Sequence, residues 1–390
     1  MGSLDRLLER KHYSELRRRI IRQAMQPLFR IGDARLTPAG RLSGQAIRRI
    51  LVCRPNHRLG NLLLLTPLLA ELERLLPDAQ VDIVLAGDHV AELFQTFPNV
   101  GHIWNLSRRM VRHPVALVRT ITAIRRTHYD LAIDPCEASQ SSRFLMTVAR
   151  PRHALGIARS RSAASPDDAW TRGAPVHMAQ WPVYLLRGAL QQPPADSGQG
   201  FPPLDIRLTP DERRHARARL ERLAGVTGAP HAQAIIGVFT EATGAKNYGI
   251  DWWRHFIDAL RASRPGCAVV EIAPPDGRPR LGGDFPCFSS PSPREVAAVI
   301  SNMTCFVSAD CGVMHLASAS GASTLGLFSV SDATKYAPYG HRSQALITRG
   351  ETPEAVAEAA SVLIGTLVAD ADPMRGNWQQ RNANAGGGSP

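Results

Sequence analysis

The sequence predicts an α/β protein made of two Rossmann-like, doubly wound domains. Short apolar runs alternate with helical stretches from residue 49 onward, the pattern of a parallel sheet with helices on both faces. A Pro- and Gly-rich segment interrupts this pattern, which then resumes. At 390 residues the chain also exceeds the size at which one core keeps growing. We expect an N-terminal extension (1–45), a first domain (46–190), a linker (191–205), a second domain (206–368) and a disordered tail (369–390).

The first domain contains five short apolar runs with helical stretches between them. Strands are predicted at Ile50–Cys53, Val81–Leu85, Val100–Trp104, Leu131–Ile133 and Ala154–Ile157. Helices are predicted at Leu62–Leu76, Ala91–Phe97, Pro114–Arg126 and Gln140–Ala149. Strand-to-helix turns in such a sheet lie at the carboxyl ends of the strands, where ligands bind.

The second domain repeats the pattern and ends in its most informative segment. Strands are predicted at Ala234–Phe239 and Ala268–Ile272, and helices at Trp252–Ala262 and Pro293–Ile300. An apolar run beginning at Cys305 then leads through Asp310 and Gly312 into a helix with His315, followed by a strand at Thr324–Phe328. Glycine allows close backbone approach, and a helix N-terminus offers free N–H groups to an anion. The turn therefore suits a diphosphate, although His315 can also be a capping or packing residue.

The composition is that of a globular protein without a membrane span. Hydrophobic residues make up 44% and charged residues 21% of the chain, and no stretch approaches the ~20 apolar residues that a spanning helix needs. The N-terminus lacks the apolar region of a signal peptide, so we expect a cytoplasmic protein. The six cysteines are scattered without a C-x-x-C pair, which argues against a metal site or disulfide framework.

The net charge of +12 calls for an acidic partner. Residues 1–30 hold eight basic against three acidic residues, with leucine and isoleucine at roughly helical spacing between them. This basic amphipathic helix is expected either to lie peripherally on a membrane surface or to pack on its own domain. The chain has no nucleic-acid-binding motif and few aromatic residues among the basic ones, so nucleic acid is not expected as a partner.

The segment 308–340 resembles the signature of glycosyltransferase family 9, the bacterial lipopolysaccharide heptosyltransferases. The family pattern D-S/T-G-x-x-H-x-A-x-A-x-G is similar to Asp310-Cys311-Gly312-Val313-Met314-His315 followed by Ala317, Ala319 and Gly321, with cysteine where the family has Ser or Thr. Pro338-Tyr339-Gly340 matches a later family motif. The resemblance runs from about residue 49 to 345 and implies the GT-B fold, with the active site between two domains. It also implies that Asp310, Cys311, Gly312, Val313 and His315 bind the donor.

A lysine-containing loop opens the second domain. A strand ends in a Thr/Gly loop that holds Lys246, where a cation would stabilise the negative charge of a leaving diphosphate. The family pattern G-x-x-x-x-x-K-x-W is similar, with Tyr248 in place of tryptophan. We therefore expect Thr240, Thr243 and Lys246 to bind the donor; a solvated loop lysine is the alternative for Lys246. The stretch Ala273–Gly277 lies where the family holds the nucleoside, so the resemblance implies that Asp276 binds the ribose.

The first domain departs from the family at one position. Its first strand runs into a turn where Arg58 and Gly60 are expected to hold an anionic acceptor group. The turn resembles the family's R-x-x-x-I-G-D start, in which the aspartate is the general base, but this chain has Asn61. An amide cannot accept that proton at neutral pH. His57, Asp134 and Glu137 are the candidate replacements, each of which can equally be an ordinary turn or cap residue.

The resemblance implies inverting, metal-independent transfer of a sugar, typically heptose from ADP-heptose, without a further cofactor. The implied acceptor is a lipopolysaccharide core, an anionic glycolipid at the membrane. Two alternatives stay open: a non-catalytic protein that binds a nucleotide sugar, which Asn61 favours, and another two-domain enzyme such as an epimerase. An epimerase needs additional acid/base carboxylates, for which the sequence offers no candidates.

Overall fold

A computed structural model describes residues 36–37, 40–87, 89–106, 114–136, 139–156, 174–191, 200–225, 234–340 and 342–369. Glu137, most of the N-terminal extension, the middle of the linker and the tail lie outside the described residues. Among the helices of the described ranges, none has the length and apolar content to cross a membrane. Within the same ranges no group of three or more His, Cys, Asp or Glu side chains is placed to hold a metal ion.

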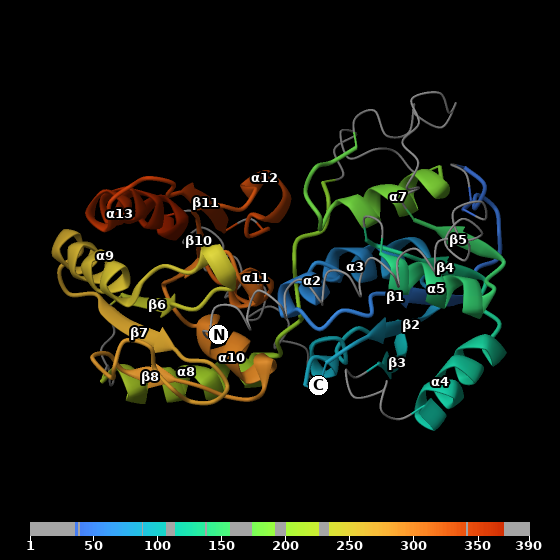
Figure 1. Cartoon of the computed structure of the whole chain (residues 1–390), viewed down its shortest axis with the longest axis horizontal. Helices are drawn as coiled ribbons and strands as arrows, with labels where there is room; N and C mark the ends of the chain where they lie inside the picture. Colours follow the sequence, from blue (N-terminus) through green and yellow to red (C-terminus); the bar gives the residue numbers. More distant parts are fainter. Residues whose placement is uncertain are drawn as a thin grey trace, which may run out of the picture.

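The first domain is built on a five-stranded parallel sheet of order β3-β2-β1-β4-β5 (Figure 1). The strands are β1 (Arg49–Cys53), β2 (Gln80–Leu85), β3 (Val100–Asn105), β4 (Leu131–Ile133) and β5 (His153–Leu155). The helices are α2 (Leu59–Leu63), α3 (Thr66–Leu75), α4 (Pro114–Arg126), α5 (Gln140–Ala149) and α7 (Trp181–Ala189). The central strands are buried on both faces, as a parallel sheet covered by helices requires.

Two predicted helices of this domain differ in the structure. The helix expected over Leu62–Leu76 is two helices, because Pro67 has no N–H to continue the hydrogen-bond ladder. The hydroxyl of Thr66 donates instead to the carbonyl of Leu63 at 2.9 Å, which satisfies the acceptor that the proline leaves. The helix expected over Ala91–Phe97 is only a 3-10 turn, Ala91–Leu93.

The second domain has a six-stranded parallel sheet of order β11-β10-β9-β6-β7-β8. Its strands are β6 (Ile235–Phe239), β7 (Ala268–Ile272), β8 (Cys287–Phe288), β9 (Cys305–Ala309), β10 (Thr324–Phe328) and β11 (Ser343–Ile347). Its helices are α8 (Pro210–Ala224), α9 (Ile250–Ser263), α10 (Pro293–Ile300), α11 (Gly312–Ala319), α12 (Ala333–Tyr336) and α13 (Pro353–Ala369). Helices α9 and α13 pack together on one face, and α8 and α10 lie on the other (Figure 1). The prediction of two doubly wound α/β domains is confirmed.

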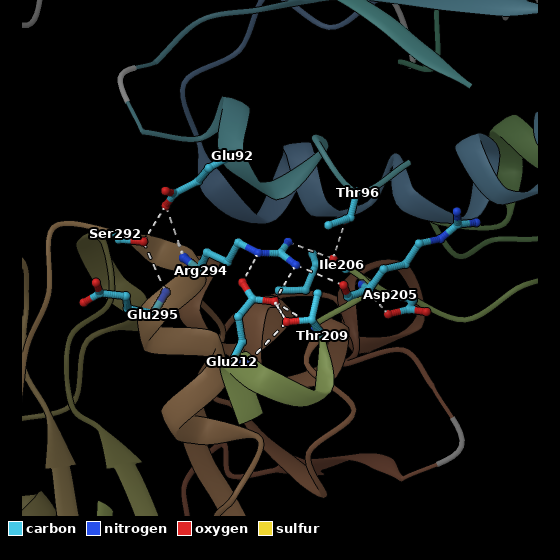
Figure 2. A network of polar contacts seen from close by, with 10 residues as sticks. Glu92, Thr96, Asp205, Ile206, Thr209, Glu212, Ser292, Arg294 and Glu295 are labelled. Atoms are coloured by element: carbon cyan, nitrogen blue, oxygen red, sulfur yellow. Dashed lines mark hydrogen bonds and ion pairs between the residues drawn. The ribbon is translucent and has the colours of Figure 1, made fainter. Parts of the chain in front are cut away.

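The chain crosses between the domains in an extended segment that both domains hold (Figure 2). The carbonyl of Ile206 accepts hydrogen bonds from Thr96 of the first domain and from Arg294 of α10, each at 3.0 Å. The Arg294 guanidinium also donates to the carbonyl of Arg207 at 2.9 Å and pairs with Glu212. These contacts fix the crossing point, which in turn fixes how the two sheets face each other.

A direct polar contact joins the domains beside this crossing. The carboxylate of Glu92, in the first domain, accepts from the Ser292 hydroxyl at 2.7 Å and from the Arg294 amide at 3.3 Å. It therefore lies at the N-terminus of α10, where a negative charge is favourable. Buried apolar residues continue across the same boundary from Leu62 through Ile206 to Leu316, so the domains share one core.

Candidate donor and acceptor site

Two predicted donor residues come together at the carboxyl ends of two adjacent strands. β6 and β9 are hydrogen-bonded in parallel, so the loop after β6 and the turn after β9 open at the same edge of the sheet. Lys246, in the loop, forms an ion pair with Asp310, in the turn. The lysine side chain is 36% exposed while that of Asp310 is 6% exposed, so the ammonium faces an open space and its partner lies beneath it.

His315 lies on the first full turn of α11 and is almost completely buried, with 4% of its surface exposed. Burial lowers its pKa to about 4, although the neighbouring Asp310 carboxylate acts in the opposite direction. The imidazole is therefore neutral at pH 7, with one N–H to donate and one nitrogen to accept. Its Nδ1 has no hydrogen-bond partner among the described residues.

The two domains meet where helices α2 and α11 begin. A Cβ atom on Gly60 would lie 2.7 Å from Cδ2 of His315, and one on Gly312 would lie 3.1 Å from the backbone nitrogen of Gly60. A side chain at Gly60 would displace the His315 ring, and one at Gly312 would crowd the backbone of Gly60, so glycine at both positions suits this approach. The first domain therefore places its predicted acceptor turn directly against the predicted donor turn of the second.

The other predicted donor residues lie at varying depth around this point. Thr240 is buried, and its hydroxyl donates to Glu271 at 3.5 Å, whereas Thr243 and Asp276 are exposed on the loops after β6 and β7. The Asp276 carboxylate accepts from the Arg278 amide at 3.2 Å. Burial raises the pKa of the Cys311 thiol, so the thiol stays neutral, although its hydrogen bond with the Ser308 hydroxyl, 3.2 Å away, acts in the opposite direction. Val313 is half-buried in the first turn of α11.

On the acceptor side, Asn61 lies in the first turn of α2 and is half-buried. Its carbonyl accepts from the Arg54 guanidinium at 3.3 Å, and the Asn56 side chain accepts from the Arg58 amide at 2.8 Å. These two bonds shape the turn. His57 and Arg58 are exposed on it.

Asp134, the candidate base that follows β4, is buried beside Arg143. Its side chain is completely buried, pairs with the equally buried Arg143 at 3.1 Å and accepts from the Cys136 amide at 3.1 Å. Burial raises the pKa of Asp134 to about 6, against the opposing effect of the Arg143 charge. This burial and pairing favour a structural role for Asp134, and its role as the general base stays a prediction. Of the other two candidates, Glu137 lies outside the described residues and His57 is open to solvent.

One group of residues at the domain boundary carried no sequence signal. His177, ahead of α7, stacks on Tyr339 with ring centroids 4.8 Å apart, and Gln180 donates to the Tyr339 hydroxyl at 3.2 Å. The His177 ring accepts from the Ala179 amide at 3.2 Å and therefore donates its other nitrogen to the Ala337 carbonyl, 3.0 Å away. Only Tyr339 belongs to a recognised motif, and single histidine and glutamine residues between motifs give no pattern to detect.

Two parallel sheets with opposing turns at their carboxyl ends define a two-domain α/β protein of the GT-B architecture. Residues 292–362 match the family model of glycosyltransferase family 9 (heptosyltransferase). This segment contains the Asp310–His315 turn, so the resemblance to family 9 that the motifs predict is confirmed there. None of the curated proteins matches the sequence significantly.

Solved structures of low sequence identity share the fold over most of the chain. The family 9 glycosyltransferase of Veillonella parvula DSM 2008 is 16% identical with a TM-score of 0.63, over 84% of this chain and 99% of that chain. E. coli ADP-heptose LPS heptosyltransferase II is 17% identical with a TM-score of 0.60, over 82% and 99%. E. coli heptosyltransferase WaaC with ADP is 18% identical with a TM-score of 0.58, again over 82% and 99%. The predicted GT-B fold is thereby confirmed.

Proposed function

We propose that the protein is an inverting, metal-independent glycosyltransferase that moves a sugar from a nucleotide donor, ADP-heptose, to an anionic glycolipid such as a lipopolysaccharide core. One observation carries the proposal. The Lys246–Asp310 ion pair and the N–H groups at the start of α11 lie together at the carboxyl ends of β6 and β9, and the Gly60 turn of the other domain lies against them. The solved E. coli WaaC structure with ADP-2-deoxy-2-fluoro heptose supports the choice of donor by analogy of fold.

In this reaction the acceptor hydroxyl attacks the anomeric carbon while the bond from that carbon to the diphosphate oxygen breaks. Negative charge grows on the leaving nucleoside diphosphate as the acceptor loses its proton. The Lys246 ammonium and the N–H groups of the first turn of α11 are placed to stabilise that charge. Asp310 holds the ammonium in place before the donor binds, and neutral His315 can donate or accept one hydrogen bond without adding charge.

Lys246→Ala is expected to weaken nucleotide-sugar binding by about 1–3 kcal/mol, the cost of losing a charge-assisted hydrogen bond. Isothermal titration calorimetry with ADP-heptose measures the effect. Lys335→Ala removes the same charge from α12 of the same domain and is the matched control, which should bind as the wild type does. Equal affinity of the Lys246 variant and the control would remove Lys246 from the site.

Substitution of Asn61 can distinguish the enzyme hypothesis from its alternative, in which the protein binds a nucleotide sugar without catalysis. We propose that Asn61 orients the acceptor, since it lies in the turn that meets α11. Asn61→Asp should then raise turnover about tenfold or more, part of the ~10²–10⁴-fold that a general base contributes. His57→Gln should lower turnover at least ~10²-fold if His57 is the base of the wild type, while donor affinity holds.

Incubation with a panel of nucleotide sugars, with and without a lipopolysaccharide acceptor, tests the function itself by the release of nucleotide. Acceptor-dependent release from ADP-heptose is the expected result, and the reaction would take place at the cytoplasmic face of the membrane that holds the acceptor. Wild-type protein that binds a donor but releases no nucleotide with any acceptor, and stays inactive as Asn61→Asp, would establish the binding-protein alternative.

A further inference from the structure

Helix α4 lies at the end of the first domain that is remote from the second domain (Figure 1). Val115 and Val118 are 64% and 62% exposed, and of the described α4 side chains only Ile124 is fully buried. Because the two valines are three residues apart, they share one face of the helix. Single exposed aliphatic residues are ordinary on protein surfaces and do not by themselves indicate a binding surface. The charged residues around the two valines are therefore the more informative feature of this face.

The exposed valines border a cationic hollow. A hollow of about 540 Å³ lies between α4 and the start of β1 and is lined by Arg49, Val118, Arg119, Thr122, Ala123, Arg126 and Thr127. Arg49 already donates to the Thr127 carbonyl at 3.2 Å, and the Thr127 hydroxyl donates to the Ala123 carbonyl at 3.0 Å. The guanidinium groups of Arg119 and Arg126 and the Thr122 hydroxyl are therefore the donors suited to a phosphate, arginine through its planar fork. The aliphatic and the cationic groups are therefore adjacent on one surface.

Acidic residues are missing from this part of the chain. Residues 93–129 contain no aspartate or glutamate. The carboxylate that ends the stretch, Asp130, accepts hydrogen bonds from the amides of Arg48 and Arg49 at 3.0 and 3.1 Å and faces Arg152 at 3.7 Å. It is thus already bound by neighbouring groups and leaves the arginines of α4 to an external anion.

We infer that α4 docks the protein onto an anionic lipid bilayer, with the arginines of the hollow on headgroup phosphates and the two valines in the interface. A helix with arginine beside exposed aliphatic residues has the composition of an interfacial helix. Nucleic acid fits less well, since α4 has no aromatic residue on which a base could stack. The inference rests on the proposed function for its purpose, because the proposed acceptor is a glycolipid of an anionic membrane.

The test is flotation of the full chain with vesicles of phosphatidylcholine alone or mixed with phosphatidylglycerol. The wild type should bind the mixed vesicles and not the neutral ones. Arg119→Gln with Arg126→Gln should lower the partition coefficient about twentyfold, since each basic residue near such a surface contributes about fivefold. Val118→Asp should lower it as well. The N-terminal extension is present in every variant and contributes equally.

The matched control is Arg222→Gln with Arg261→Gln, which removes the same charge from exposed positions of the second domain and should bind as the wild type does. Far-UV circular dichroism checks that all variants are folded. An α4 double variant within about twofold of this control would overturn the inference. Wild-type protein that ignores vesicles but binds duplex RNA through the same arginines would overturn it too. The flotation assay contains neither donor nor acceptor. Its result is therefore independent of whether the protein proves to be a glycosyltransferase.

Discussion

Replacing Arg143 with methionine is expected to lower the free energy of unfolding by about 3–5 kcal/mol, the cost of leaving one partner of a buried ion pair without the other. Both Arg143 and Asp134 are completely buried, and their charged atoms are 3.1 Å apart. The guanidinium is also packed closely against Gly156, where a Cβ atom would lie 2.8 Å from its nitrogens. The pair therefore holds the carboxyl ends of β4 and β5 together.

Thermal unfolding followed by circular dichroism measures this effect, and the double variant Asp134→Asn, Arg143→Met is its control. Removal of both charges should recover part of the stability that the single variant loses, because no uncompensated charge remains. The double variant should also keep nucleotide-sugar binding, which we propose takes place in the other domain. A single variant as stable as the wild type would contradict the structural role of the pair. If the double variant lost turnover while its stability stayed unchanged, Asp134 would be supported as the general base.

The fold could be predicted because each strand is a short apolar run with turn residues at its ends. β4 and β10 lie at Leu131–Ile133 and Thr324–Phe328, as the sequence analysis expects. Helix boundaries were less certain where a proline falls inside an apolar run, as Pro67 does. The hydrophobic periodicity of such a run continues across the helix boundary. The boundary is set only by the proline, which lacks the N–H of the next helical hydrogen bond.

The proximity of Lys246 and Asp310 was predictable for a different reason. Lys246 and Asp310 each stand at the end of an apolar strand, and parallel strands bring such positions to one edge of the sheet. The burial of Asp134 could not be foreseen, since it depends on the ion pair with Arg143 of α5. His177 and Gln180 were missed because their partner, Tyr339, lies about 160 residues away and no local pattern links them.

His315 should make the folded state sensitive to acid between about pH 6.5 and pH 4. Its pKa is about 4 in the folded protein because the ring is buried, against an ordinary value of 6.5. Below pH 6.5 the unfolded chain therefore takes up a proton that the folded chain does not, and stability falls with pH until about pH 4. The difference between the two pKa values corresponds to about 3 kcal/mol.

The comparison of wild type with His315→Gln isolates this contribution. Asp134 works in the opposite direction, since its raised pKa favours the folded state as the pH falls through about 6, so the wild-type curve alone would mix the two. In the difference between the two proteins the Asp134 contribution cancels.

Chemical unfolding at pH 7 and near pH 4.5 should show the wild type losing about 2–3 kcal/mol more than the variant. His102→Gln, on an exposed ring, should follow the wild type. Parallel curves for His315→Gln and wild type would mean that the imidazole is hydrated, which would also remove the reason to expect a neutral hydrogen-bonding group beside the diphosphate.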